Sequence, residues 1–150
     1  MTTDNRPPIT RSRPPTPGSR PPIPVRSAQE LEVYRFAYAL AMDVFTLSTK
    51  WPPEERYALT DQVRRSSRSV CANLREAWAK RRYGAHFVSK LTDADAENGE
   101  TETWLDFARD CQYLATEEHG DLVQRCRTVG KMLGTMLKAP SAFLINENDA

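Results

Sequence analysis

Basic residues are concentrated in residues 62–82 and could bind phosphate groups. This segment holds seven Lys and Arg and one acid, Glu76, whereas residues 85–118 hold nine acids and two bases. Lys and Arg neutralise the phosphates of nucleic acid by charge alone, and we find no motif that reads bases. The candidate phosphate contacts are Arg64, Arg68, Arg75, Lys80, Arg81 and Arg82. Alternatively, the basic segment only faces the acidic one within an ordinary helical bundle.

A second set of polar residues runs at helical spacing beside the apolar positions of the same segment. If residues 62–82 and 85–114 are antiparallel helices joined at Tyr83-Gly84, Arg65 lies opposite Thr101 and can reach Glu97, Glu100 or Glu102. We expect a structural polar network that fixes the helix register; a small binding site is the alternative. Its members are Gln62, Arg65, Ser69, Asn73, Glu76, Glu97 and Glu100.

Neither the residue types nor their spacing support catalysis. His86 and His119 fall near predicted helix ends, with no Ser or Cys placed beside them. Glu97-x-x-Glu100 lacks the His that di-iron bundles pair with Glu. We therefore expect no enzymatic activity, no metal and no cofactor. The cysteines form no CxxC pair and fall among apolar positions, so we expect buried, reduced thiols at Cys71, Cys111 and Cys126.

The first 26 residues differ in composition from the rest of the chain. They hold eight of the 11 prolines and five arginines, with almost no large apolar residue. Such a segment cannot bury enough apolar surface to fold, so we expect a disordered tail with polyproline-II character. Arg-Pro-Pro recurs at Arg6, Arg13 and Arg20, which could dock in an aromatic groove of a partner or act as a solvated tether.

The remaining chain predicts four helices and no strand. We expect them at about residues 28–49, 54–82, 85–114 and 121–138, with a break near Thr60, a turn at Gly120 and a capping box at Ser27 and Glu30. Short connections between long helices give an all-α, antiparallel up-down four-helix bundle. Residues 1–26 would be the tail, 27–140 the bundle and 141–150 a frayed C-terminal tail.

Apolar residues at steps of three and four predict the core face of each helix. The stripe of the third helix includes Asn98 and Thr101, so the core should be polar at mid-height. The other stripe residues are Val63, Ser67, Val70, Leu74, Ala77, Phe87, Leu91, Ala94, Leu105, Ala108, Cys111, Leu122, Cys126, Val129, Leu133 and Met136.

The first predicted helix is apolar around most of its circumference. Its polar residues fall on one narrow stripe that includes Glu32, Arg35, Asp43 and Thr46. One small bundle covers only one side of such a helix, so we expect a second copy of the chain on another side. No apolar signal region and no run of 18 apolar residues is present, so we expect a cytoplasmic protein without a membrane span.

Several motifs resemble one known family. They are Leu31-Glu32-Val33-Tyr34, the run from Trp51-Pro52-Pro53-Glu54-Glu55-Arg56 to Arg65-Ser66, Ser69-Val70-Cys71-Ala72-Asn73-Leu74-Arg75-Glu76, and Val129-Gly130-Lys131-Met132-Leu133. The chain from about 31 to 137 thereby resembles the four-helix-bundle proteins first noted as products of intervening sequences in 23S ribosomal RNA genes. It departs from many members at Cys71 and at Glu76-Ala77, where they carry Pro and Glu-Gly.

The resemblance implies a ring-shaped homo-oligomer, a homopentamer. It also implies kinship with the accessory variability determinant of diversity-generating retroelements, a basic pentamer considered to bind nucleic acid and a reverse transcriptase. We therefore expect a non-catalytic oligomeric scaffold that binds RNA or DNA electrostatically, as an accessory of a retroelement reverse transcriptase. The alternative is a protein-interaction bundle of unknown role without affinity for nucleic acid.

Overall fold

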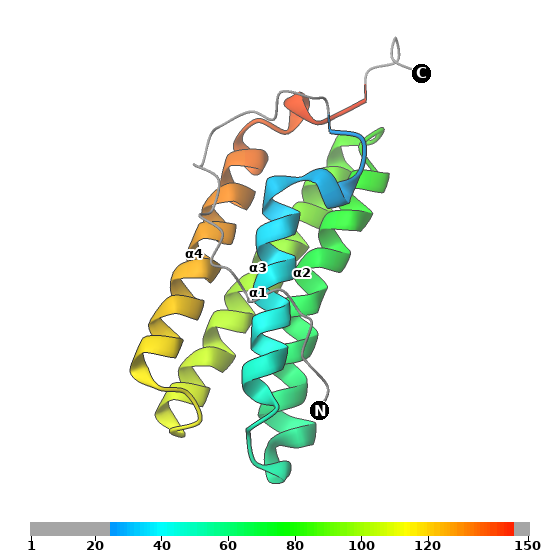
Figure 1. The fold of residues 1–150 in the computed structure, drawn as a ribbon. Helices are drawn as coiled ribbons and strands as arrows, with labels where there is room; N and C mark the ends of the chain where they lie inside the picture. The colour runs from blue at the N-terminus through cyan, green and yellow to red at the C-terminus, as the bar shows by residue number, and fades with distance from the viewer. Residues whose placement is uncertain (1–24, 146–150) are drawn as a thin grey trace, which may run out of the picture.

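The chain folds as four long helices packed side by side in a bundle, as the sequence predicts (Figure 1). The structure, a computed structural model, describes residues 25–145. The predicted tail before Val25 and the last five residues lie outside the described residues. The long helices are α1 (Glu32–Ser48), α2 (Asp61–Ala79), α3 (Gly84–Asp110) and α4 (Thr116–Lys138). Residues 25–145 otherwise form turns and short helical segments, with no strand.

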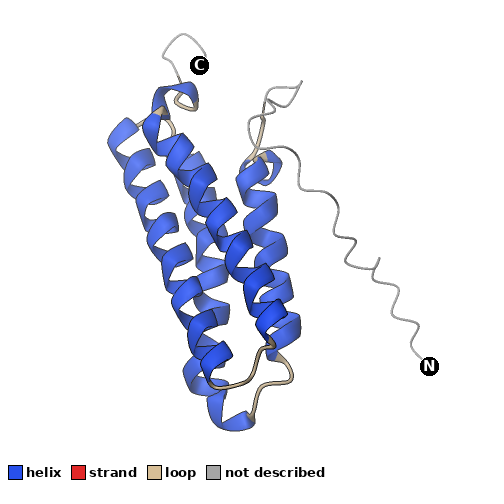
Figure 2. Ribbon diagram, turned by 90° about the vertical axis from the view of Figure 1, so that its left-hand side faces the viewer, coloured by secondary structure: helices blue, strands red, loops and turns tan. Residues whose placement is uncertain are grey.

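Each long helix packs against two others. α2 lies between α1 and α3, and α4 lies between α3 and α1. The colour gradient along the chain shows that neighbouring helices run in opposite directions (Figure 1), and the side view shows the loops that join them at the ends of the bundle (Figure 2). This arrangement follows from connections too short to allow a crossover.

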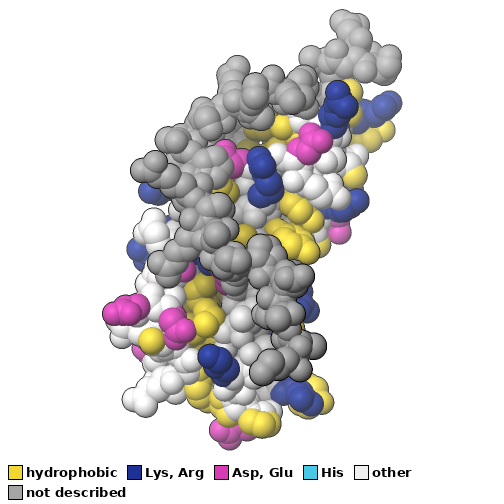
Figure 3. Space-filling view, viewed as in Figure 1, with side chains coloured by type: hydrophobic (Ala, Val, Ile, Leu, Met, Phe, Trp, Pro, Cys, Tyr) yellow, Lys and Arg dark blue, Asp and Glu magenta, His cyan; other side chains and the backbone are white. Residues whose placement is uncertain are grey.

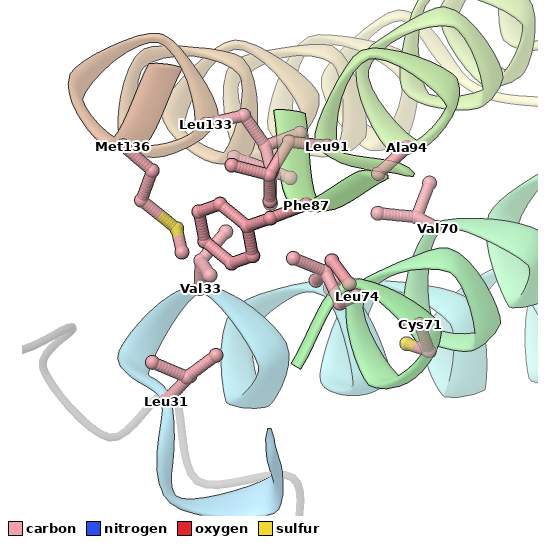
Figure 4. Close-up of a cluster of buried hydrophobic side chains, with 13 residues drawn as sticks. Leu31, Val33, Val70, Cys71, Leu74, Phe87, Leu91, Ala94, Leu133 and Met136 are labelled. Carbon is pink, nitrogen blue, oxygen red and sulfur yellow. The ribbon is translucent and has the colours of Figure 1, made fainter. Parts of the chain in front are cut away.

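The predicted core stripes are buried, and a polar layer divides the core into two clusters. One cluster surrounds Phe87 and Leu74 (Figure 4), and the other surrounds Leu105 and Val63. Between them lie four buried polar residues, Ser66, Ser67, Asn98 and Thr101. The expectation of a polar core at mid-height is therefore correct. Cys111 is the exception among the stripe residues, because its side chain is exposed after the end of α3.

The first helix begins later than predicted, because the capping box at Ser27 does not form. Ala28–Glu30 form a 3-10 turn, and α1 starts after the extended Leu31. The Ser27 hydroxyl makes no capping bond; its main-chain carbonyl accepts from the Glu30 N–H at 3.1 Å. The Glu30 carboxylate instead accepts from the Arg26 N–H at 2.7 Å. This break in the helix lets Leu31 turn into the core, where it is buried.

The second helix is broken near the predicted position and ends earlier than predicted. Pro53–Glu55 form a 3-10 turn and Arg56–Thr60 a π-helical turn, with a kink at Ala58. α2 ends at Ala79 rather than at Arg82. Its last residues give way to a tight turn in which the Tyr83 N–H donates to the Lys80 carbonyl at 3.0 Å. Lys80, Arg81 and Arg82 therefore belong to the α2–α3 turn.

The turn between α3 and α4 lies at residues 111–115, not at Gly120, which is inside α4. Gln112 adopts the left-handed conformation with φ of 66°. Its N–H donates to the Arg109 carbonyl at 2.9 Å, and the Tyr113 N–H donates to the Ala108 carbonyl at 2.8 Å. These two bonds form a Schellman motif. Glycine usually occupies the left-handed position, so a Gln there carries no recognisable stop signal.

The ordered bundle also continues past the predicted boundary at residue 140. Pro140–Ala142 form a 3-10 turn, and Phe143 and Leu144 pack against the core cluster. The Phe143 ring stacks on Phe87 with a centroid distance of 6.2 Å. This segment closes the end of the bundle at which α2 passes into α3, where the Ile145 N–H donates to the Arg81 carbonyl at 3.2 Å.

Candidate nucleic-acid interface

Two of the predicted arginines, Arg64 and Arg68, are held in place by the neighbouring helix α1. Their guanidinium groups lie over the Phe45 ring, at 4.8 Å and 5.7 Å from its centroid. Arg64 Nε also donates to Ser48 Oγ at 2.8 Å. Both interactions orient the guanidinium groups without cancelling their charge, since a π face and a hydroxyl are neutral partners.

The local field at this site is positive. The pKa of Arg64 is lowered from its ordinary value, first by burial and then by the nearby charges of Arg68 and Arg56, which Asp61 only partly offsets. Neighbouring cations repel one another, and an anion placed among them would relieve that repulsion. A surface depression of about 450 Å³ lies among these side chains, lined by Asp61, Arg64, Arg65, Arg68, Ser69 and Ala72 of α2.

The other four predicted contacts lie farther along the chain. Arg75 is exposed near the end of α2 and lies against the Gln29 amide. Lys80 and Arg82 lie in the α2–α3 turn and not, as the sequence predicts, on a helix that continues to residue 82. Arg81 is half-buried with its guanidinium 3.6 Å from the Trp78 ring centroid, and burial lowers its pKa. Figure 3 shows Lys and Arg side chains beside hydrophobic ones at the upper right of the molecule.

The carboxylates of the acidic helix α3 do not neutralise the six candidate phosphate contacts. Its carboxylates pair with other cations, Glu97 and Glu100 with Arg65 and Glu102 with Arg127. Within residues 25–145, no carboxylate lies within ion-pair distance of the phosphate-contact candidates, Arg64, Arg68, Arg75, Lys80, Arg81 and Arg82. Among residues 25–145, Arg65 is thus the one arginine of α2 that pairs with carboxylates, those of Glu97 and Glu100 on α3.

The structure brings together only part of the predicted polar network. Arg65 lies 3.1 Å from a Glu100 oxygen and 3.5 Å from a Glu97 oxygen. Burial raises the pKa of Glu97, an effect that hydrogen bonding to Glu100 reinforces and Arg65 opposes. Asn73 Nδ2 donates to the Ser69 carbonyl at 2.9 Å, which keeps the contact within α2.

Two predicted members stand apart from this network. Glu76 is exposed and pairs with Lys90 at 2.7 Å, which lowers the pKa of Glu76 and raises that of Lys90. Within residues 25–145, the Gln62 side chain makes no hydrogen bond.

Sequence reasoning missed the polar contacts that tie the helices most directly. Thr101 Oγ1 lies 2.8 Å from Ser66 Oγ and joins α2 to α3 in the core. Asn98 Nδ2 donates to the Cys126 carbonyl at 2.8 Å and joins α3 to α4. Ser66 could have been found, because it lies beside Val63 and Val70 on the core face; the carbonyl partner of Asn98 leaves no signal in the sequence.

The outer surface of α1 exposes fewer apolar side chains than predicted, but two large ones remain exposed. Asp43 does not continue an outward polar stripe; its side chain turns toward α4 and pairs with Arg125 at 2.5 Å. Phe36 and Leu47 pack against the core clusters, so the bundle itself covers them. Tyr38 and Met42 remain 53% and 45% exposed. The apolar surface that stays exposed on α1 is thus a ridge rather than most of the helix.

The described part of the chain offers little else for chemistry. Between Val25 and Ile145, no three His, Cys, Asp or Glu side chains are grouped so that they could hold a metal ion. No helix in that range is both long and apolar enough to cross a bilayer. His119 is buried with its Nε2 2.8 Å from Asp106, an interaction between α4 and α3 within the bundle.

The sequence profile of the family described as 23S rRNA-intervening sequence protein matches residues 29–135. The chain belongs to this family. The match spans the four helices up to the last turn of α4, as the resemblance of the motifs predicts.

One solved structure has a similar fold. It is a protein with unknown function from the S23 ribosomal protein family of Bacteroides thetaiotaomicron, 27% identical in sequence, with a TM-score of 0.65. The similarity covers 71% of this chain and 96% of that one. A search of the curated proteins finds no match.

Proposed function

We propose that this family member is a non-catalytic, oligomeric scaffold that binds the phosphate backbone of nucleic acid through the outward arginines of α2. One observation carries the proposal. Arg64 and Arg68 are oriented by Phe45 and lack an ion-pair partner among the described residues, whereas Arg65 on the same helix is paired with two carboxylates. Unpaired, oriented cations are what backbone recognition requires, and they carry no sequence preference.

Assembly would multiply this surface. The exposed Tyr38 and Met42 on α1 support contact with a second copy, which would remove two large apolar side chains from water. The number five comes from the resemblance to pentameric relatives, as does a retroelement reverse transcriptase as a protein partner. In a ring, each copy adds its own phosphate contacts, and the affinity would then fall steeply with salt.

Fluorescence anisotropy with labelled RNA and DNA, single-stranded and duplex, tests the proposal. We expect binding at about 50 mM salt that weakens as salt rises. Replacing Arg68 and Arg75 with Gln should weaken binding and lower the salt slope by about one for each phosphate that is no longer neutralised. The matched control is Arg65→Gln, which removes the same charge from the same helix at a paired site. Equal losses from Arg68→Gln and Arg65→Gln would contradict the proposal.

The role of Arg64 and the assembly of the chain into a ring-shaped oligomer need separate experiments. Arg64 also bonds to Ser48, so the charge reversal of Arg64 together with Arg68 and Arg75 is informative only if circular dichroism shows an intact bundle. Sedimentation at micromolar concentration tests assembly, and Tyr38→Glu with Met42→Glu should reduce it. A folded monomer of the unaltered chain at that concentration would remove the oligomer from the proposal.

A protein-interaction bundle without affinity for nucleic acid is the second candidate. The exposed ridge of α1 favours it, since Tyr38 and Met42 suit a protein partner and contribute nothing to phosphate binding. Absence of binding to all four nucleic acids at about 50 mM salt would select this function over the first.

A further inference from the structure

The α2–α3 turn carries an exposed aromatic pair that the electrostatic interface does not explain. Tyr83 is 62% exposed at the end of the turn, and its ring meets the His86 ring at a centroid distance of 5.8 Å with an interplanar angle of 63°. Neither ring belongs to a core cluster. The Tyr83 ring therefore contributes little to the packing of the bundle and stays open to a partner that can stack on it.

The turn is braced, so its side chains are held in one place. The Tyr83 N–H donates to the Lys80 carbonyl at 3.0 Å, and the Ile145 N–H donates to the Arg81 carbonyl at 3.2 Å. Arg81 covers the Trp78 ring, and its Nε donates to the Trp78 carbonyl at 2.9 Å. The C-terminal segment thus supports the turn from one side, while α2 and α3 fix its two ends.

Three basic residues lie next to the aromatic pair in the chain. Lys80 and Arg82 lie within three residues of Tyr83 in the same turn, and Arg81 lies between them. An open aromatic ring beside a track of cations is the arrangement that single strands bind, because bases stack on the ring while phosphates follow the charge. A duplex cannot use the ring in this way, since its bases already stack on one another.

We infer that the α2–α3 turn binds single-stranded nucleic acid, with one unpaired base stacked on Tyr83 and the adjoining phosphates on Lys80 and Arg82. This inference rests on the proposed function and names its substrate class. The arginines of α2 would hold either kind of backbone, and the turn would supply the preference for a strand whose bases are unpaired.

Anisotropy with one labelled single strand and its own duplex tests the inference at constant salt. Tyr83→Ala should weaken single-strand binding roughly 5- to 150-fold and leave duplex binding unchanged. Tyr83→Phe keeps the ring and should bind as the unaltered chain does. Tyr57→Ala is the matched control, because Tyr57 is 85% exposed beyond the opposite end of α2. Tyr83 belongs to no core cluster, so we expect the Ala variant to fold, which circular dichroism checks.

Three results would overturn the inference. They are unchanged single-strand binding by Tyr83→Ala, an equal loss for single strand and duplex, and tighter binding of the duplex by the unaltered chain. If Arg68→Gln with Arg75→Gln still weakens binding in those cases, the proposed function stands and only the single-strand preference fails. If the unaltered chain binds neither nucleic acid, the proposed function fails as well.

Discussion

The hydrogen bond between Ser66 and Thr101 makes a quantitative prediction about the polar layer. Both side chains are buried, at 0% and 1% exposure, and their oxygens lie 2.8 Å apart. Thr101→Val keeps the shape of the side chain and removes its hydroxyl. Ser66 then retains only the Val63 carbonyl at 3.3 Å, a longer bond. We therefore expect a loss of about 1.5 kcal/mol, near the cost of one buried hydrogen bond rather than of a fully unsatisfied group.

The double variant separates the bond from the cost of each substitution. Ser66→Ala alone should cost about 1 kcal/mol, because Thr101 keeps the Glu97 carbonyl at 2.9 Å. Removing both hydroxyls leaves no unsatisfied partner, so the double variant should cost about 1 kcal/mol less than the sum of the singles. If the hydrogen bond fixes the packing of α2 on α3, this coupling must be present.

Urea unfolding followed by circular dichroism at 222 nm measures these free energies. All four proteins should be compared at one protein concentration, because assembly would make the apparent stability depend on it. A loss of about 1.5 kcal/mol corresponds to about 5 °C in melting temperature for a domain of this size. Strictly additive losses, or a Thr101→Val protein as stable as the unaltered chain, would refute the reasoning.

Three further predictions concern the α3–α4 turn, the thiols and the half-buried carboxylate of Glu97. Gln112→Gly should stabilise the bundle by about 1 kcal/mol in the same urea assay, because Gly relieves the left-handed φ of 66°; a destabilised variant would contradict this. A thiol reagent should label Cys111 quickly and Cys71 and Cys126 only after unfolding, since burial raises their pKa values to about 11 and about 12; fast labelling of all three would contradict it. Burial raises the pKa of Glu97 in the folded state, so its negative charge lowers the stability of the bundle above that pKa. This loss disappears as the pH falls to the ordinary value of 4.5, because Glu97 is then protonated in the folded state. The Glu97→Gln protein should lack this part of the pH dependence of the unfolding free energy, and parallel pH profiles of the two proteins would contradict the prediction.

Local sequence signals predicted the helices where those signals act through the main chain of neighbouring residues. The break after Trp51 follows from Pro52 and Pro53, which cannot donate hydrogen bonds within a helix. The same logic misplaced the α3–α4 turn, because Gly120 looked like the stop signal while Gln112 adopts the left-handed conformation instead. A non-glycine residue takes that conformation only when the surrounding structure compensates for its strain, and a sequence does not show this compensation.

The sequence likewise predicted the positions of some residues of the candidate site and not of others. Helical spacing alone placed Arg65 opposite Thr101 and within reach of Glu97, Glu100 or Glu102, because residues of antiparallel helices can be paired by counting outward from their common turn. The structure pairs Arg65 with Glu97 and Glu100, and Glu102 with Arg127. It could not place Lys80, Arg81 and Arg82, since the end of α2 depends on how tightly the turn closes and on the C-terminal segment that braces it.

The features that followed from the order of amino acids were periodic: four helices, the core stripes, the polar layer at Asn98 and Thr101, and the excess of positive charge on α2. The spacing of residues in the sequence predicts which of them share a helix face, because every helix has the same rise and rotation for each residue. The packing of the helices then selected which charges stay unpaired. Asp43 turned inward to Arg125, the α3 carboxylates paired with Arg65 and Arg127, and Phe45 held Arg64 and Arg68 at the surface. Pairing depends on distances between helices, and these are set only when the core packs.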